Sequence, residues 1–195
     1  MTIRDTGTEQ LIKDTAKRVF FLEGRLNATT QDIADAAGVN RTLLNYYFRS
    51  RDILFQQVFE EATNEIGKRL DEVMDSDLPF KQKIENLITV FLAETTLYPY
   101  RETFLVTQIN CHVFMFKDTN KPHKIREFIK QIQEEMDKGN VRHMNPLHFI
   151  MNLFSLMVYP LIMAPLNKQL FDVDDEKYSQ LMAERKELIL AQIFS

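Results

Sequence analysis

The chain has 195 residues, 45% of them hydrophobic, which suits one or two globular domains. Only five glycines and six prolines argue against many tight β-turns, and long stretches of 3.6-residue periodicity predict an all-α fold. The net charge of −4 argues against a protein that coats nucleic acid. Residues 1–51 nevertheless carry eight Lys/Arg against six Asp/Glu, a mildly basic end that suits local contact with DNA.

Cysteine usage and the N-terminal sequence bear on the compartment. Cys111 is the sole cysteine, so an intrachain disulfide is excluded and a reducing compartment is favoured. The first ten residues lack the apolar stretch of a signal peptide. We expect a cytoplasmic protein.

The N-terminal elements begin with a helix predicted over residues 8–24, with its apolar side chains at helical spacing. A second helix is predicted directly after Thr30, the expected N-cap, whose hydroxyl can accept a hydrogen bond from a backbone N–H one turn in. It should stop at Gly38, because a helix end favours a residue that tolerates a positive φ.

A third, short helix is predicted after the glycine turn. Asn40 is its N-cap candidate, and Leu44 and Phe48 lie four residues apart, so they share one buried face. Residues 29–48 therefore predict a helix-turn-helix. Helix–glycine–helix hairpins also occur in all-α proteins without nucleic acid, so a protein–protein interaction module is the alternative.

The side chains left exposed on the third helix suit a DNA major groove. Arginine can pair with guanine, asparagine with adenine, and threonine can contact a thymine methyl group, as Arg41, Asn45 and Thr42 would. Hydroxyls of threonine and tyrosine can donate to phosphates, which set register without reading sequence.

Residues 11–55 resemble the DNA-binding domain of the TetR family of transcriptional regulators. The matching positions are Ile12, Ala16, Phe20, Gly24, Ala28–Thr30, Ile33–Ala34, Ala37–Val39, Leu44, Tyr47–Phe48 and Arg51. The chain departs from the family at Thr42, where glycine is usual, and at Asn45, where tyrosine is usual. Both departures lie on the recognition helix, so they affect the identity of the operator rather than the fold.

The resemblance implies that Thr29, Tyr47 and Arg51 contact phosphates, and that Arg41, Thr42, Leu43 and Tyr46 face the bases or their flanks. Together with the residues chosen by their side-chain chemistry, the expected DNA-binding residues are Thr29, Thr30, Asn40, Arg41, Thr42, Leu43, Asn45, Tyr46, Tyr47 and Arg51. We predict a DNA-binding domain over residues 1–51 and an effector-binding and dimerisation domain over residues 52–195.

The second domain is predicted to consist of helices only. The sequence pattern places them at residues 52–74, 79–97, 101–116, 122–138, 146–164 and 175–194, which gives about nine helices in the chain. Asn145 and Pro146 read as N-cap and first residue of one helix, and Pro160 should kink or end it.

The segment Leu147–Leu166 carries no charge over about a membrane-spanning length. Two prolines and several polar residues within it favour a buried core or dimer helix over a membrane-associated regulator. We expect no membrane partner and a twofold homodimer through residues 146–164 and 175–194, as the resemblance also implies. Such a dimer would bind a pseudo-palindromic operator.

The second domain is rich in large, soft side chains, which more often pack a core but can also line an apolar cavity. The resemblance adds that family members commonly sense small molecules there. The candidates for an apolar or amphipathic effector are Phe91, Tyr98, Phe104, Gln108, His112, Met151, Asn152 and Phe154. Effector binding would move the two DNA-binding domains of the dimer apart through the helix at residues 52–74 and so release DNA. Repression is the family's usual mode.

No motif predicts catalysis, a cofactor or a metal. The sequence lacks a glycine-rich phosphate loop, GxSxG and HExxH. Cys111 and His112 are adjacent, so on a helix they point about 100° apart. His143 and His148 are five apart, which is a poor spacing for two ligands on one helical face. We expect a regulator rather than an enzyme.

Overall fold

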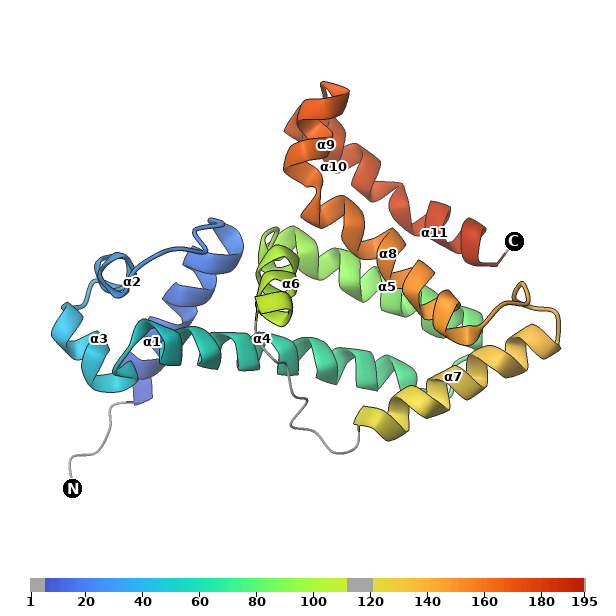
Figure 1. The fold of residues 1–195 in the computed structure, drawn as a ribbon, viewed down its shortest axis with the longest axis horizontal. Helices are drawn as coiled ribbons and strands as arrows, with labels where there is room; N and C mark the ends of the chain where they lie inside the picture. The colour runs from blue at the N-terminus through green and yellow to red at the C-terminus, as the bar shows by residue number, and fades with distance from the viewer. Residues whose placement is uncertain (1–5, 112–120, 195) are drawn as a thin grey trace. The chain divides into compact units, whose positions relative to one another are not determined.

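The structure is a computed structural model that describes residues 6–111 and 121–194, and the predicted all-α class is confirmed. Those residues form the elements α1 (Thr6–Lys17), η1 (Arg18–Leu22), α2 (Thr30–Ala37), α3 (Arg41–Phe48), α4 (Arg51–Met74), α5 (Phe80–Leu97), α6 (Arg101–Cys111), α7 (Lys121–Asp137), α8 (Pro146–Ile162), α9 (Ala164–Phe171), α10 (Asp175–Ala183) and α11 (Arg185–Ile193) (Figure 1).

The described residues form more helices than the nine expected, because the two long C-terminal helices are each broken. α8 passes through Pro160 and ends at Ile162, and α9 leaves it at an angle of 69°. The final helix is interrupted at Glu184, which ends α10 and precedes α11. The predicted start of α8 is confirmed, because Asn145 Oδ1 accepts the N–H of Leu147 at 2.9 Å and Pro146 is the first helical residue.

The chain divides into two compact units. One comprises residues 1–68 and 95–108, and the other comprises residues 69–94 and 109–195. The unit that contains the predicted head thus extends past residue 51 along α4 and takes in the end of α5 and most of α6. The physical reason is the core described next.

Aromatic side chains from three separate segments form the core of the first unit. Phe104 of α6 is 1% exposed, and its ring lies 4.8 Å from that of Phe21 and 4.5 Å from that of Phe55. The N–H of Tyr100 donates to the carbonyl of Phe21 at 2.9 Å. Phe21 lies in η1, a π-helical turn that follows α1. These contacts join residues 95–108 to the head.

The second unit has its own apolar core. Its most buried members are Ile84, Ile88, Ile132, Leu153 and Ile189, all fully buried. Within this unit, α8 packs against α7, α9 and α11, and α10 contacts α9 and α11 (Figure 1). Within the described ranges no single helix is long and apolar enough to cross a membrane. The bent α8–α9 pair meets length and composition criteria only jointly, as core helices also do.

Candidate DNA-binding site

The N-terminus of α2 is fixed by reciprocal hydrogen bonds. Thr29 Oγ1 accepts the N–H of Asp32 at 3.2 Å, while the carboxylate of Asp32 accepts the N–H of Thr29 at 2.8 Å. This is a capping box, which satisfies two backbone donors at a helix start. Thr29 is therefore the N-cap, and the prediction that Thr30 caps the helix is wrong. Thr30 is the first helical residue and is 8% exposed.

The turn between α2 and α3 follows the predicted chemistry. Gly38 has φ 67° and ψ 27°, a left-handed conformation, and its N–H donates back into α2. Val39 packs partly buried against the core of the first unit. Asn40 Oδ1 accepts the N–H of Leu43 at 2.7 Å, so Asn40 caps α3 as expected.

α3 has one buried and one exposed face. Leu44 and Phe48 are fully buried and Tyr47 is 7% exposed, so the helix is held against the core. Leu43 is half-buried and packs against the same core. The Tyr47 ring, for which a phosphate contact is predicted, lies mostly within this packing.

The opposite face of α3 carries the base-reading candidates. The side chains of Arg41, Thr42 and Asn45 are exposed, and Tyr46 is 57% exposed. No hydrogen bond joins the side chains of Arg41, Thr42 or Asn45 to another residue in the described ranges. The structure thus brings together on one helix face the side chains that the sequence analysis assigned to bases.

A tight turn with unusual backbone geometry links α3 to α4. Arg49 has φ 55° and ψ −38°, and the N–H of Ser50 donates to the carbonyl of Phe48 at 2.5 Å. This is a γ-turn with positive φ, a strained conformation for a residue with a Cβ atom. Ser50 Oγ then accepts the N–H of Ile53 at 3.2 Å and stabilises the start of α4.

The side chain of Arg51, for which the resemblance implies a phosphate contact, also makes contacts within the unit. Its Nε donates to the carbonyl of Ala28 at 2.8 Å, and one terminal nitrogen donates to the carbonyl of Leu26 at 2.6 Å. Its guanidinium carbon lies 5.0 Å from the centre of the Phe55 ring. Two of the five N–H donors of Arg51 are therefore engaged inside the unit.

Arg25 is a candidate that the sequence analysis missed. Its guanidinium donates to the carboxylate of Asp32 at 3.0 Å, and its side chain is 47% exposed beside the start of α2. Hydrogen bonds from the Thr29 hydroxyl and N–H, with the charge of Arg25, hold the pKa of Asp32 below its ordinary value. Arg25 precedes the motif by four residues, and its only sequence signal was its charge.

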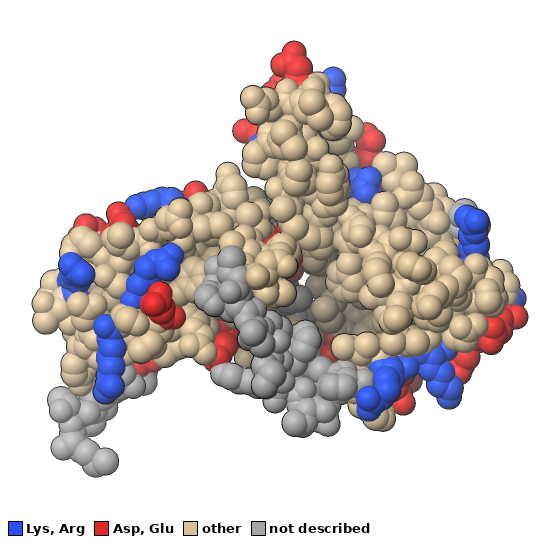
Figure 2. Space-filling model, in the orientation of Figure 1, with Lys and Arg blue, Asp and Glu red and all other residues tan. Residues whose placement is uncertain are grey.

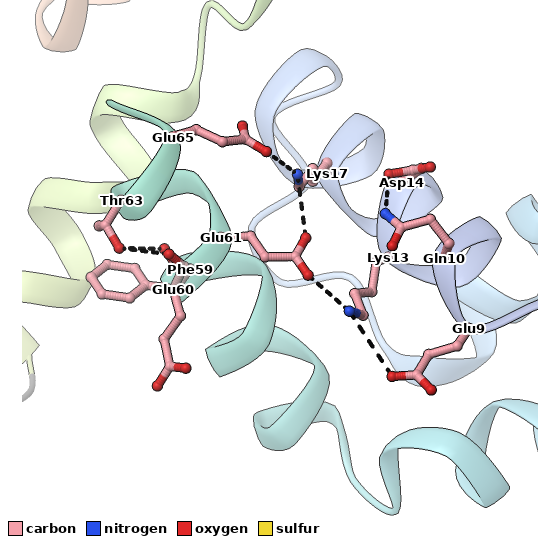
Figure 3. A network of polar contacts seen from close by, with 10 residues as sticks. All are labelled: Glu9, Gln10, Lys13, Asp14, Lys17, Phe59, Glu60, Glu61, Thr63 and Glu65. Atoms are coloured by element: carbon pink, nitrogen blue, oxygen red, sulfur yellow. Dashed lines mark hydrogen bonds and ion pairs between the residues drawn. The ribbon is translucent and has the colours of Figure 1, made fainter. Parts of the chain in front are cut away.

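Ion pairs join α4 to the C-terminal half of α1 (Figure 3). Glu61 accepts from Lys13 Nζ at 2.8 Å and lies 3.3 Å from Lys17 Nζ, which also contacts Glu65 at 2.8 Å. Burial alone would raise the pKa of Glu61, but the two lysines outweigh it and lower that pKa. Burial likewise opposes the charge on Lys17, yet Glu65 and Glu61 raise its pKa.

The surface of the first unit does not carry one continuous basic patch on the face shown. Lys/Arg and Asp/Glu side chains are interspersed there (Figure 2). The modest charge excess of residues 1–51 is consistent with this pattern. Recognition would depend on the exposed face of α3 rather than on a strong general field.

Comparison with known proteins identifies the helix-turn-helix unit. Residues 12–58 match the model of the family described as bacterial regulatory proteins, tetR family. This part of the chain is therefore similar to the DNA-binding domain of the TetR family. The match contains α2, α3 and the start of α4, which are the elements described above.

Curated relatives match this chain over only part of their length. The uncharacterized HTH-type transcriptional regulator YhgD of Bacillus subtilis is 28% identical over 85 residues, 43% of this chain and 44% of YhgD. The HTH-type transcriptional regulator AcrR of Shigella flexneri is 34% identical over 61 residues, 31% of this chain and 28% of AcrR. The chain thus aligns with less than half of either relative.

Solved structures share the fold over nearly the whole chain. The ketosteroid transcriptional regulator KstR2 of Mycobacterium tuberculosis has a TM-score of 0.70 at 12% identity, covering 99% of this chain and 97% of KstR2. The regulator FadR of Bacillus subtilis, solved with stearoyl-CoA, has a TM-score of 0.62 at 18% identity, covering 95% and 99%. These low identities show the TetR-type fold alone.

The effector candidates whose side chains are described are divided between the two units. Tyr98 and Phe104 pack in the core of the first unit, whereas Phe91 is buried in the core of the second. Met151 and Asn152 are exposed on α8. His112 and the side chain of Gln108 lie outside the described residues.

Phe154, the remaining candidate, lines an open groove of about 910 Å³ on the second unit. We call this the α8–α11 groove; it is lined by Phe154, Ser155, Leu156, Val158, Tyr159, Pro160, Ile162, Asn167, Phe171, Tyr178, Leu181, Met182, Glu184, Arg185 and Leu188. The Tyr178 hydroxyl donates to the carbonyl of Pro160 at 2.6 Å. The side-chain amide of Asn167 donates to the same hydroxyl oxygen at 3.2 Å. Most of the lining is apolar, so covering the groove with another apolar surface would be energetically favourable.

Titratable side chains elsewhere give no sign of a metal centre in the described part of the chain. No group of three or more His, Cys, Asp or Glu residues is arranged there to hold an ion. Both histidines are exposed: His143 precedes α8, and His148 lies in its first turn.

Proposed function

We propose that this chain is a sequence-specific DNA-binding transcriptional regulator of the TetR family that binds a pseudo-palindromic operator as a homodimer and represses the genes it controls. The observation that carries the proposal is the two-faced α3. Its rear is fixed by buried Leu44 and Phe48, while Arg41, Thr42 and Asn45 are exposed and without side-chain partners in the described chain. Such a helix can enter a major groove without rearrangement.

Each exposed side chain of α3 has a distinct proposed role. Arg41 pairs with guanine O6 and N7, and Asn45 pairs with adenine N6 and N7. Thr42 packs against a thymine methyl group, and Tyr46 lies at the flank of the site. The capped N-terminus of α2, with Thr29 exposed, faces a phosphate, because a helix start presents backbone N–H groups and a partial positive charge.

The homodimer is proposed to form through residues 146–164 and 175–194. Large apolar side chains on these segments are exposed in the single chain, among them Tyr159 at 57%, Leu188 at 50% and Leu181 at 42%. All three line the α8–α11 groove. A second copy that packs on this face by a twofold axis would bury them and pair two α3 helices at the spacing of one DNA turn.

We further propose release of the operator by an apolar or amphipathic effector bound in the second unit. The names of two neighbours of the same fold refer to a ketosteroid, which is largely apolar, and to stearoyl-CoA, which joins a long apolar chain to a charged coenzyme A group. α4 belongs to both units, so a ligand that favours one packing of the second unit can act on the head through it.

The proposal is tested by selecting duplexes from a random DNA pool with the purified protein. The expected result is a pseudo-palindrome whose half-sites are separated by about one helical turn, 10 to 10.5 base pairs. Failure to enrich any sequence, even at low salt, would overturn DNA recognition and favour the protein–protein interaction module. The recovered duplex then serves as the probe for steroids and acyl-CoA thioesters that release it.

A variant tests the assignment of roles within α3. Arg41→Ala should relax sequence preference at one position of each half-site and weaken specific binding by about 1–3 kcal/mol. The repeated selection with this variant measures both effects. A uniform loss on all duplexes would instead assign Arg41 to a phosphate.

A further inference from the structure

The guanidinium of Arg51 bridges two carbonyl groups that lie more than twenty residues earlier in the chain. Arg51 opens α4, but its side chain reaches the carbonyls of Ala28 and Leu26 at 2.8 and 2.6 Å. Its side chain is 34% exposed, and its remaining terminal nitrogen lies 3.9 Å from the exposed carboxylate of Asp52. The carbon at its centre sits 5.0 Å above the Phe55 ring.

The two carbonyls belong to the loop that leads into α2. Neither forms part of a helix, and the loop is otherwise closed by the N–H of Ala28 on the carbonyl of Arg25 at 3.0 Å. Ala28 directly precedes Thr29, the N-cap of α2. The Arg51 bridge therefore fixes where the phosphate-facing start of α2 lies relative to α3 and α4.

A planar guanidinium can donate to two acceptors at once in a fixed geometry. A lysine ammonium on its flexible stem does not hold two acceptors in a fixed geometry. A charged donor to a carbonyl also forms a stronger hydrogen bond than a neutral one. Nε and one terminal nitrogen are engaged and the ring of Phe55 covers one face, so the orientation of the guanidinium is set by contacts within the unit.

We infer that Arg51 is a positioning residue for DNA binding, which holds the N-terminus of α2 in register with α3, and not a phosphate contact. The inference rests on the proposed function. Arg51 variants should then lose affinity because the start of α2 is displaced. The family resemblance instead implies that they lose affinity because a cation no longer contacts a phosphate.

The test compares Arg51→Lys and Arg51→Met with the matched variant Arg49→Met, which removes an exposed cation two residues earlier. Affinity for the selected duplex is measured over a series of salt concentrations, at a temperature where each variant is shown to be folded. Loss of one phosphate contact lowers the slope of log affinity against log salt by about 0.9. Both Arg51 variants should bind about tenfold more weakly with the wild-type slope.

A rescue by charge alone would overturn the inference. If Arg51→Lys keeps wild-type affinity, or if Arg51→Met lowers the slope by about 0.9 as a phosphate contact should, Arg51 is a phosphate ligand. A wild-type protein that binds no duplex would instead refute the proposed function. The Arg51 bridge would then still be tested by amide hydrogen exchange, which should accelerate over residues 26–32 in Arg51→Lys and not over residues 41–48.

Discussion

Gly24 and Gly38 share nearly the same backbone conformation but have different surroundings. Their φ angles are 69° and 67°, both in the left-handed region that favours glycine. A Cβ atom on Gly24 would lie 3.0 Å from the ring of Tyr100, whereas a Cβ atom on Gly38 would have no neighbour within 4 Å. Both positions need glycine for their backbone conformation, but only Gly24 also needs it because of a close neighbour.

We expect Gly38→Ala to lower the free energy of unfolding by about 1 kcal/mol, from the backbone alone. Gly24→Ala should cost about 1 kcal/mol more, because its Cβ crowds the Tyr100 ring. Urea denaturation measures both. In a Tyr100→Ala background the two substitutions should become equal, and a persistent difference would show that the ring is not the cause.

Arg49 is the residue at which a glycine should improve stability. Its φ of 55° with ψ of −38° strains any residue that has a Cβ atom. Arg49→Gly should raise the free energy of unfolding by about 0.5–1 kcal/mol, after the larger entropy of a glycine in the unfolded chain is allowed for. Thermal unfolding checks this, with Arg49→Ala as the control that keeps the Cβ and should change little.

At the scale of elements, the ion pairs between α1 and α4 attach the head to the first half of α4 (Figure 3). Their pH dependence follows from the pKa shifts. The lowered pKa of Glu61 means that its stabilisation is present above its ordinary value of 4.5 and is lost as pH falls through the lower, folded value. The raised pKa of Lys17 means that its contribution is present below 10.5 and is lost as pH rises through the higher, folded value.

We therefore expect Glu61→Gln to lower the free energy of unfolding at pH 7, by on the order of 1 kcal/mol for a partly buried network. The difference from wild type should shrink as the pH falls below 4.5 and through the lowered pKa of Glu61, because the carboxylate becomes protonated in the folded protein there. Glu72→Gln is the control, because Glu72 is exposed on the same helix and makes no ion pair in the described structure. Equal effects of the two substitutions would contradict a role for the network.

At the scale of the whole molecule, the proposed homodimer is the feature on which operator binding depends. Leu188→Glu places a charge in the α8–α11 groove at a side chain that is 50% exposed in the single chain, so the fold of each subunit should survive. We expect the variant to sediment as a monomer at micromolar concentration and to lose binding to the two-half-site duplex, because burying an unpaired charge at an interface is strongly unfavourable.

The matched control is Leu97→Glu, which changes a leucine that is 62% exposed and lies outside the groove. This variant should sediment as the wild type does. A wild-type protein that is monomeric at micromolar concentration, or a dimer unaffected by Leu188→Glu, would place the interface elsewhere or remove it.

The sequence alone determined the features that depend on neighbouring residues. Asn40 and Asn145 cap their helices and Gly38 ends α2 as predicted, because capping and left-handed turns need only the side chain and the local backbone. Periodicity likewise placed Leu44 and Phe48 on the buried face of α3 and left Arg41 on the exposed one. The fold class and the base-reading face follow from such local rules.

Only the tertiary structure decided what distant segments do to one another. Arg51 bridges two loop carbonyls, and Tyr98 packs in the core that α6 shares with the helix-turn-helix; no local pattern predicted either contact. The α8–α11 groove also depends on packing between helices. The physical reason is that exposure and the choice of hydrogen-bond partner are set through space, by residues whose proximity a linear pattern does not record.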